Sequence, residues 1–189
     1  MPEADPPLIA VYRGWGGYQT SLVRAVENLT PEHLAFRAAP DSRSVGEIAR
    51  HISTGRIDWF LRIAAPRSAE LAAQIPEWNY DPHGNRYAKE DFISLNTPDL
   101  TRWLKVTGAM VQTTLEQWRV SDLERTYRHT FRGTTYTVSY QWTIWRILSH
   151  DIHHGGQLSE LLYMQNVDLP DLGWQGGHIV EVSKADREE

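Results

Sequence analysis

The chain contains no cysteine, and this absence limits the chemistry it can perform. A sequence of 189 residues without cysteine has no disulfide, no thiolate ligand for a metal and no cysteine nucleophile. If thiol chemistry takes place on this protein, the thiol must therefore come from a small molecule.

Long apolar runs and blocks of positive charge are missing as well. No run of about 18 apolar residues occurs, so no membrane-spanning helix is expected. The 19 Lys and Arg residues are scattered through a chain of net charge −5, which gives nucleic-acid binding no electrostatic support. The acidic, proline-rich start MPEADPP lacks the basic and apolar parts of a signal peptide, which predicts a cytoplasmic protein. We therefore expect a small-molecule substrate, with neither nucleic acid nor membrane as partner.

The composition is that of a globular protein with many aromatic side chains. Hydrophobic residues make up 41% of the chain and charged residues 23%, and there are 8 Trp and 8 Tyr. This length fits one domain with a sizeable core, and no internal repeat or second domain is apparent. We predict a single domain over residues 1–189, with an aromatic-rich core or pocket.

Four segments show the three-and-four spacing of apolar residues that is typical of helices in a bundle. Ser44-x-x-Glu47 is a capping box at the start of the second, Thr97-Pro98 provides an N-cap and an initial proline for the third, and Ser139 can cap the fourth. The predicted helices run over residues 8–29, 45–63, 98–118 and 140–165.

The connections between these segments differ in length. Residues 30–43 read as a loop, and residues 65–96 form a long connection with a short helix at about 69–74, which suits a crossover, a lid or both. Residues 124–138 are rich in Thr and Tyr around Arg132-Gly133, which favours a small hairpin or an extended loop. After Val167 we expect an irregular tail that ends in a frayed, charged segment at 184–189.

His150 and His154 are four residues apart in the fourth helix, so their imidazoles project from the same side, one turn apart. One helix can grip a metal ion with such a pair, although in a chain with 8 His the HxxxH spacing alone is weak evidence. A solvated or core-packed histidine cluster is the alternative. His153 lies further out and is expected in a supporting or surface position. Gly155-Gly156 indicates close packing or ligand approach, or else a bend.

A third ligand is available on the second helix. His51 lies about two turns into that helix, beside its apolar stripe, and can face the interior near the edge of a bundle. If the second and fourth helices are neighbours, His51, His150 and His154 converge. Three neutral histidines leave a coordination position open, as in catalytic rather than structural metal sites.

With these features the chain resembles the DinB/YfiT-like family of metalloenzymes. The similarity runs from about residue 11 to residue 165 and rests on LTPEHL at 29–34, SVGEIARHI at 44–52 and WRILSHDIHHGGQL at 145–158. A histidine after a Ser-capped start, followed roughly 100 residues later by HxxxH and Gly-Gln, is far more specific than HxxxH alone. One departure is Gly155, where relatives often carry a basic residue that could bind an anionic substrate.

The resemblance implies an all-α fold, a four-helix bundle with a long crossover between helices two and three and a short hairpin or extended loop before helix four. It also implies a divalent metal (zinc, nickel, iron or manganese) held by His51, His150 and His154. The implied activity is a thiol-dependent S-transferase or isomerase using a low-molecular-weight thiol, with metal-dependent hydrolysis as a variant. No catalytic or cofactor-binding residue is assigned.

Two other classes remain open: a non-catalytic metal- or ligand-binding protein of the stress response, and a structural bundle with a vestigial cluster. Association as a homodimer through bundle faces is also expected.

The remaining candidate residues receive structural interpretations. We predict that four histidines outside the cluster are solvent-exposed, that four tryptophans belong to the core, that Asp58 lies at the surface rather than beside a metal ligand, and that Gln157 can hydrogen-bond a neighbouring histidine. The histidines are His33, His83, His129 and His178, and the tryptophans are Trp15, Trp103, Trp142 and Trp145.

Overall fold

The computed structural model describes residues 5–167 and 172, and within them the protein is mainly helical with two small antiparallel sheets. The four longest helices are α1 (Trp15–Val26), α3 (Val45–Arg62), α5 (Thr97–Gln117) and α6 (Tyr140–Tyr163). Shorter helical segments are η1 (Leu8–Ala10), α2 (Pro31–Ala35), α4 (Ser68–Ala72), η2 (Glu90–Phe92) and η3 (Val120–Glu124). The strands are β1 (Trp78–Tyr80), β2 (Arg86–Ala88), β3 (Thr126–Phe131) and β4 (Thr134–Ser139).

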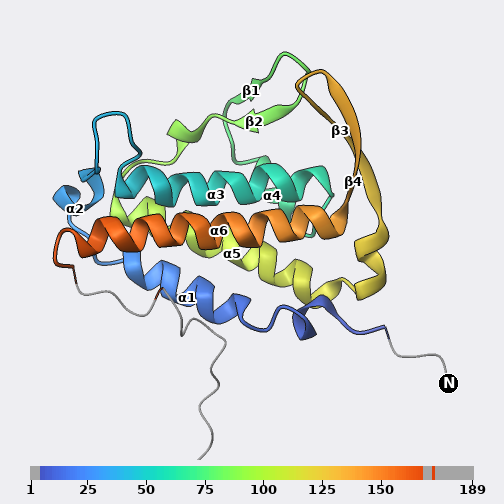
Figure 1. The fold of residues 1–189 in the computed structure, drawn as a ribbon, viewed down its shortest axis with the longest axis horizontal. Helices are drawn as coiled ribbons and strands as arrows, with labels where there is room; N and C mark the ends of the chain where they lie inside the picture. The colour runs from blue at the N-terminus through green and yellow to red at the C-terminus, as the bar shows by residue number, and fades with distance from the viewer. Residues whose placement is uncertain (1–4, 168–171, 173–189) are drawn as a thin grey trace, which may run out of the picture.

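The four long helices pack against one another around one apolar core. α3 contacts both α5 and α6, and α1 contacts α5 and α6 from the other side. Figure 1 shows α3 and α6 side by side and running in opposite directions, with β3 and β4 covering the end where α6 begins. The side chains that meet between these helices are fully buried, among them Leu22, Ile52, Leu104 and Ile144. The pair α3 and α6 is the part of the fold that positions His51, His150 and His154.

Capping residues set the starts of the helices that carry them. Ser44 Oγ accepts from the backbone N–H of Glu47 at 3.2 Å, and Glu47 Oε2 accepts from the N–H of Ser44 at 2.7 Å, which confirms the predicted capping box. Ser139 caps α6 as predicted. The cap of α5 is Asn96 rather than Thr97, because the Thr97 hydroxyl donates to the carbonyl of Leu29 at 2.6 Å instead.

Several expectations about the shorter segments were wrong. The first helix begins only at Trp15, because Leu8 is buried in the separate turn η1 and its N–H donates to the carbonyl of Trp118. The connection 30–43 contains α2, which Thr30 caps with Pro31 in the first turn. The short helix expected at about 69–74 is confirmed, with its bounds at Ser68–Ala72.

The two sheets correct the all-α expectation. β1 pairs with β2 inside the long connection 65–96, where no strand was predicted. β3 pairs with β4 from Thr126 opposite Ser139 to Phe131 opposite Thr134, within the segment for which a hairpin or an extended loop was expected. Arg132 and Gly133 make the turn with positive φ values of 50° and 80°. The expectations for the tail after Val167 and for His178 lie outside the described residues, apart from Leu172. Among the described helices, none has both the length and the apolarity that crossing a membrane requires.

The two consecutive glycines of α6 have different surroundings, and this leads to a prediction. A Cβ on Gly155 would overlap the Tyr18 hydroxyl, which donates to the carbonyl of Asp151 at 2.9 Å, whereas a Cβ on Gly156 would meet nothing within 4 Å. We expect Gly155→Ala to lower the free energy of unfolding by about 1–3 kcal/mol through overpacking. Gly156→Ala should raise it by about 0.5–1 kcal/mol, because alanine favours the helix. Urea unfolding of both variants checks this, and a shift of the same sign in both would contradict it.

Candidate metal centre

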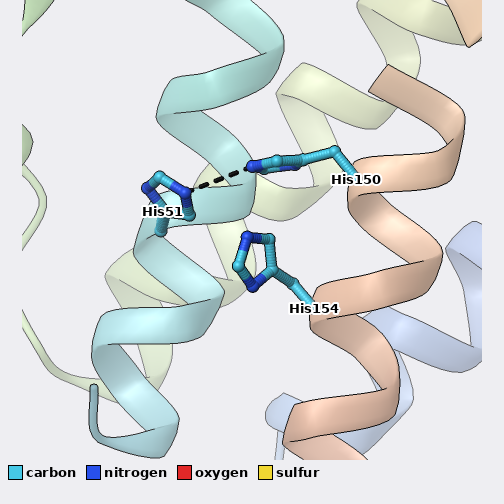
Figure 2. A group of neighbouring side chains, drawn as sticks. All are labelled: His51, His150 and His154. Carbon is cyan, nitrogen blue, oxygen red and sulfur yellow. Dashed lines mark hydrogen bonds between the residues drawn. The ribbon is translucent and has the colours of Figure 1, made fainter. Parts of the chain in front are cut away.

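His51 from α3 and His150 and His154 from α6 come together across the interface of the two helices, as Figure 2 shows. Their candidate ligand atoms all lie within 4.8 Å of one another. His51 Nε2 and His150 Nε2 are 3.2 Å apart. Two nitrogens that share a tetrahedral zinc ion at 2.0–2.1 Å are separated by about 3.3 Å, so this pair already has the spacing of two ligands.

A side-chain oxygen faces the Nδ1 atom of each imidazole. Glu90 Oε1 lies 2.6 Å from His51 Nδ1, and Gln157 Oε1 lies 2.7 Å from His154 Nδ1. Asp151 Oδ1 makes a longer contact of 3.5 Å with His150 Nδ1. An Nδ1–H that donates to such an oxygen leaves Nε2 with its lone pair free, and this is how supporting residues fix the tautomer of metal-binding histidines.

The surroundings of His154 favour its neutral imidazole, and those of Glu90 favour its ionised carboxylate. Burial, together with the positive charges of the neighbouring histidines, lowers the pKa of His154 to about 4, although its hydrogen bond to Gln157 opposes this shift. Burial alone would raise the pKa of Glu90, but the hydrogen bond and positive charge of His51, with Arg43 and Arg50 nearby, hold that pKa below its usual value. Near neutral pH, His154 is therefore deprotonated, which is the state that a metal requires.

The donor set fits a divalent transition metal. Three imidazoles with no thiolate suit zinc, nickel or iron, and the carboxylate of Glu90 orients the ring of His51. The described residues hold three ligands rather than four in this cluster, so an ion there would keep a position for an exogenous molecule.

A cavity of about 530 Å³ opens beside His154. Its lining combines the cation of Arg43, the hydroxyl of Ser42 and the apolar side chain of Ile48 with Gln157 and His154 of α6. The cavity wall therefore carries both the positive charge of Arg43 and the carboxylate of Glu160. The cavity is large enough for a small-molecule substrate.

A buried ion pair supports the α6 side of the cluster from behind. Arg56 Nε donates to Asp151 Oδ2 at 2.8 Å, and both side chains are fully buried. The same guanidinium donates to Gln19 Oε1 at 2.7 Å and to the carbonyl of Leu104 at 3.2 Å. Asp151 thereby links the centre of the helix packing to His150, its neighbour in sequence.

The structure agrees with some predictions for individual residues. His153 is exposed and stands outside the cluster, with its ring centroid 5.0 Å from that of His154. Gln157 does hydrogen-bond a histidine. His83 is exposed, and Trp15 and Trp103 belong to the core.

Other predictions for individual residues were wrong. Trp142 and Trp145 are 44% and 62% exposed rather than buried. His129 is partly buried, with its ring 5.4 Å from that of Trp59. His33 is also only partly exposed, because it belongs to α2 and its Nδ1 accepts from the N–H of Thr30. Asp58 is partly buried rather than exposed: its carboxylate accepts from the N–H of Ala88 at 2.9 Å, and burial raises its pKa to about 6.

Sequence reasoning missed Glu90, the residue that contacts His51. Glu90 lies in η2, within the long connection, and no spacing rule relates it to a histidine 39 residues earlier. Arg56 and Asp151 are charged residues on otherwise apolar helix faces. This pattern in the sequence could have indicated a buried ion pair.

Removing the charge of Glu90 provides a test of its supporting role. We expect Glu90→Gln to weaken zinc binding by about 10- to 100-fold, the usual effect of losing a residue that orients a metal-bound histidine. Glu77→Gln is the matched control, because Glu77 belongs to the same connection but pairs with Lys89 at the surface. Competition titration with a chromophoric chelator measures both, and equal affinities would show that Glu90 does not orient the ligand.

Comparison with known proteins identifies the class. The family model of the DinB superfamily matches residues 18–158, so the chain belongs to that superfamily. No curated protein matches the chain.

Solved structures share the fold at low sequence identity. A DinB-like protein from Bacillus cereus has a TM-score of 0.59 at 19% identity, with 86% of this chain and 93% of that chain covered. A protein from Exiguobacterium sibiricum assigned to the DinB family has a TM-score of 0.58 at 20% identity, with 88% and 97% covered. The DinB-like protein YjoA from Bacillus subtilis has a TM-score of 0.55 at 15% identity, with 86% and 95% covered.

Proposed function

We propose that this DinB-superfamily protein is a metal-dependent enzyme acting on a small molecule, with His51, His150 and His154 holding one divalent ion. The observation that carries the proposal is the convergence of three imidazoles, each with an oxygen facing its Nδ1 atom, next to a cavity. When bound, the ion would supply Lewis acidity, lowering the pKa of a thiol or water molecule at its open position.

The side chains of this protein would prepare the site in three ways. Glu90, Asp151 and Gln157 orient the imidazoles, so that little rearrangement is needed when the ion enters. Arg43 adds a cation to a cavity wall that also carries Glu160, and this cation is the group that would pair with an anionic substrate or an ionised thiol. Ile48 and Leu161 add an apolar part to the cavity wall that would pack against the apolar part of a substrate.

Within this class we favour a thiol-dependent S-transferase or isomerase that uses a low-molecular-weight thiol, with hydrolysis as the variant. The chain has no thiol of its own, so the cofactor thiol would have to enter through the cavity. Zinc, nickel, iron and manganese are the candidate ions. A non-catalytic metal-binding role in the stress response is the competing function.

We also propose that residues 1–189 form one domain, a cytoplasmic four-helix bundle of α1, α3, α5 and α6 with residues 65–96 as its crossover. Exposed Trp145 and Ile152 on the outer side of α6 support association as a homodimer.

Elemental analysis by mass spectrometry tests the metal and the activity in sequence. The protein is purified tag-free, without chelators or immobilised metal, beside the His51→Ala/His154→Ala double variant. About one ion per chain in the wild type, absent from the folded variant, would support the site. Thiol-transfer and hydrolysis assays with that metal then decide between an enzyme and a binding protein. No metal after equilibration with all four ions would contradict the proposal.

A further inference from the structure

A second cavity lies at the other end of the interface between α3 and α6. The cavity beside His154 is lined by the beginning of α3 and the end of α6, whereas the second is lined by Trp59 near the end of α3 and by Trp142 and Arg146 near the start of α6. Because the two helices run in opposite directions, these are opposite ends of one interface (Figure 1). The second cavity has a volume of about 540 Å³, within the range of small-molecule sites.

The walls of this second cavity are aromatic. Trp59 packs edge-on against Trp142, with ring centroids 5.4 Å apart, and the β3–β4 hairpin adds Phe131 and Tyr136. Phe131 is 54% exposed and Tyr136 is 49% exposed, so neither side chain belongs to the core. Several large aromatic faces that meet around one cavity, uncovered by the described residues, favour a planar apolar ligand.

Arg146 lines this cavity, Arg62 lies beside its Trp59 wall, and Asp81 is close enough to His129 to act on that side chain. The Arg146 guanidinium lies 4.8 Å from the ring centroid of Trp59, and that of Arg62 lies 5.0 Å from the same centroid. Within residues 5–167 and 172, Arg146 forms no ion pair and its guanidinium donates no hydrogen bond, and no carboxylate lines the cavity. Burial and the charges of Arg62 and Arg146 lower the pKa of His129 in the cavity wall, which Asp81 opposes.

We infer that this cavity binds a planar aromatic anion, an aromatic carboxylate or sulfonate. Its ring stacks against Trp142, and its anionic group accepts hydrogen bonds from Arg146, whose guanidinium has no carboxylate partner among the described residues. Arg146 precedes His150 by four residues on α6, an axial rise of about 6 Å, so this binding site and the histidine cluster share one helix. The inference that the cavity binds this anion does not depend on the metal site. The further step, that the cavity is part of a substrate site, rests on the proposed function.

Calorimetric titration with 2-naphthoate tests this inference. We expect the wild type to bind 2-naphthoate about tenfold more tightly than the neutral 2-naphthylmethanol, and Arg146→Gln to abolish that preference. Trp142→Ala should weaken binding at least about tenfold, since it removes a stacking face. Trp145→Ala is the matched control, because Trp145 is an exposed tryptophan of the same helix outside the cavity lining. Arg128→Gln, on an exposed arginine of β3 that does not line the cavity, controls for loss of charge.

The same titration on the His51→Ala/His154→Ala double variant separates this inference from the proposed function. Unchanged binding there supports a site independent of the metal, even if the protein proves to have no metal. Binding lost in the folded double variant would place the anion at the histidine cluster and overturn the inference. Equal losses in Trp142→Ala and Trp145→Ala, tighter binding of the neutral alcohol, or no binding up to about 1 mM would overturn it too.

Discussion

His154→Ala is expected to weaken zinc binding by about 10²- to 10³-fold while the helices stay folded. Structural zinc sites with four ligands bind with about 10–16 kcal/mol, or roughly 3–4 kcal/mol for each ligand, and a factor of ten corresponds to about 1.4 kcal/mol. His154 is largely buried and its Nδ1 already contacts Gln157, so Nε2 is the ring nitrogen left to bind the ion, and the truncation removes it. The truncation leaves a small gap at the edge of the cavity rather than inside the core.

His153→Ala is the control for this experiment. His153 adjoins His154 on the same helix, but it is exposed and lies outside the cluster. We expect its zinc affinity to stay within about twofold of the wild type, since it supplies no ligand atom and no contact to Nδ1 of a ligand. Chelator competition monitors both variants, and circular dichroism confirms that they are folded. Equal weakening in the two variants would mean that the helix as a whole, and not His154, determines affinity.

The ligand cluster could be predicted from the sequence because it depends on short-range regularities. HxxxH within an amphipathic helix fixes the relation of His150 to His154, and the Ser44 capping box fixes where the helix that carries His51 begins. Only the pairing of the two helices had to be assumed, and family resemblance supplied it. When α3 and α6 pack side by side, the faces that carry His51, His150 and His154 meet, and the three imidazoles come together.

The parts that could not be predicted depend on contacts between distant segments. Glu90 reaches His51 through a turn in the long connection, and the hairpin β1–β2 has strands of only three residues, too short to show a period. Trp142 was assigned to the core because aromatic residues usually lie there. It borders a cavity instead, since the β3–β4 hairpin packs beside the start of α6 and leaves the indole partly uncovered. Helical spacing indicates which face a residue occupies, but not what covers that face.

Asp151→Ala is expected to lower the free energy of unfolding by about 3–5 kcal/mol, because it leaves the guanidinium of Arg56 buried without its counter-charge. Arg56 would keep its hydrogen bonds to Gln19 and to the carbonyl of Leu104, but neither neutralises the cation. Urea unfolding measures the loss, with Glu70→Ala as control, since Glu70 pairs with Arg67 at the surface, where little change is expected.

A double-mutant cycle shows whether that loss belongs to the ion pair or only to the volume of the side chain. Arg56→Met should destabilise by a similar amount when the carboxylate of Asp151 remains charged. The double variant Arg56→Met/Asp151→Leu should be less destabilised than the sum of the single changes by at least about 2 kcal/mol, because it removes both buried charges together. Additive losses would show that the two groups act independently. Asp151 would then act mainly through its contact with His150. In that case Asp151→Ala should also lose zinc affinity.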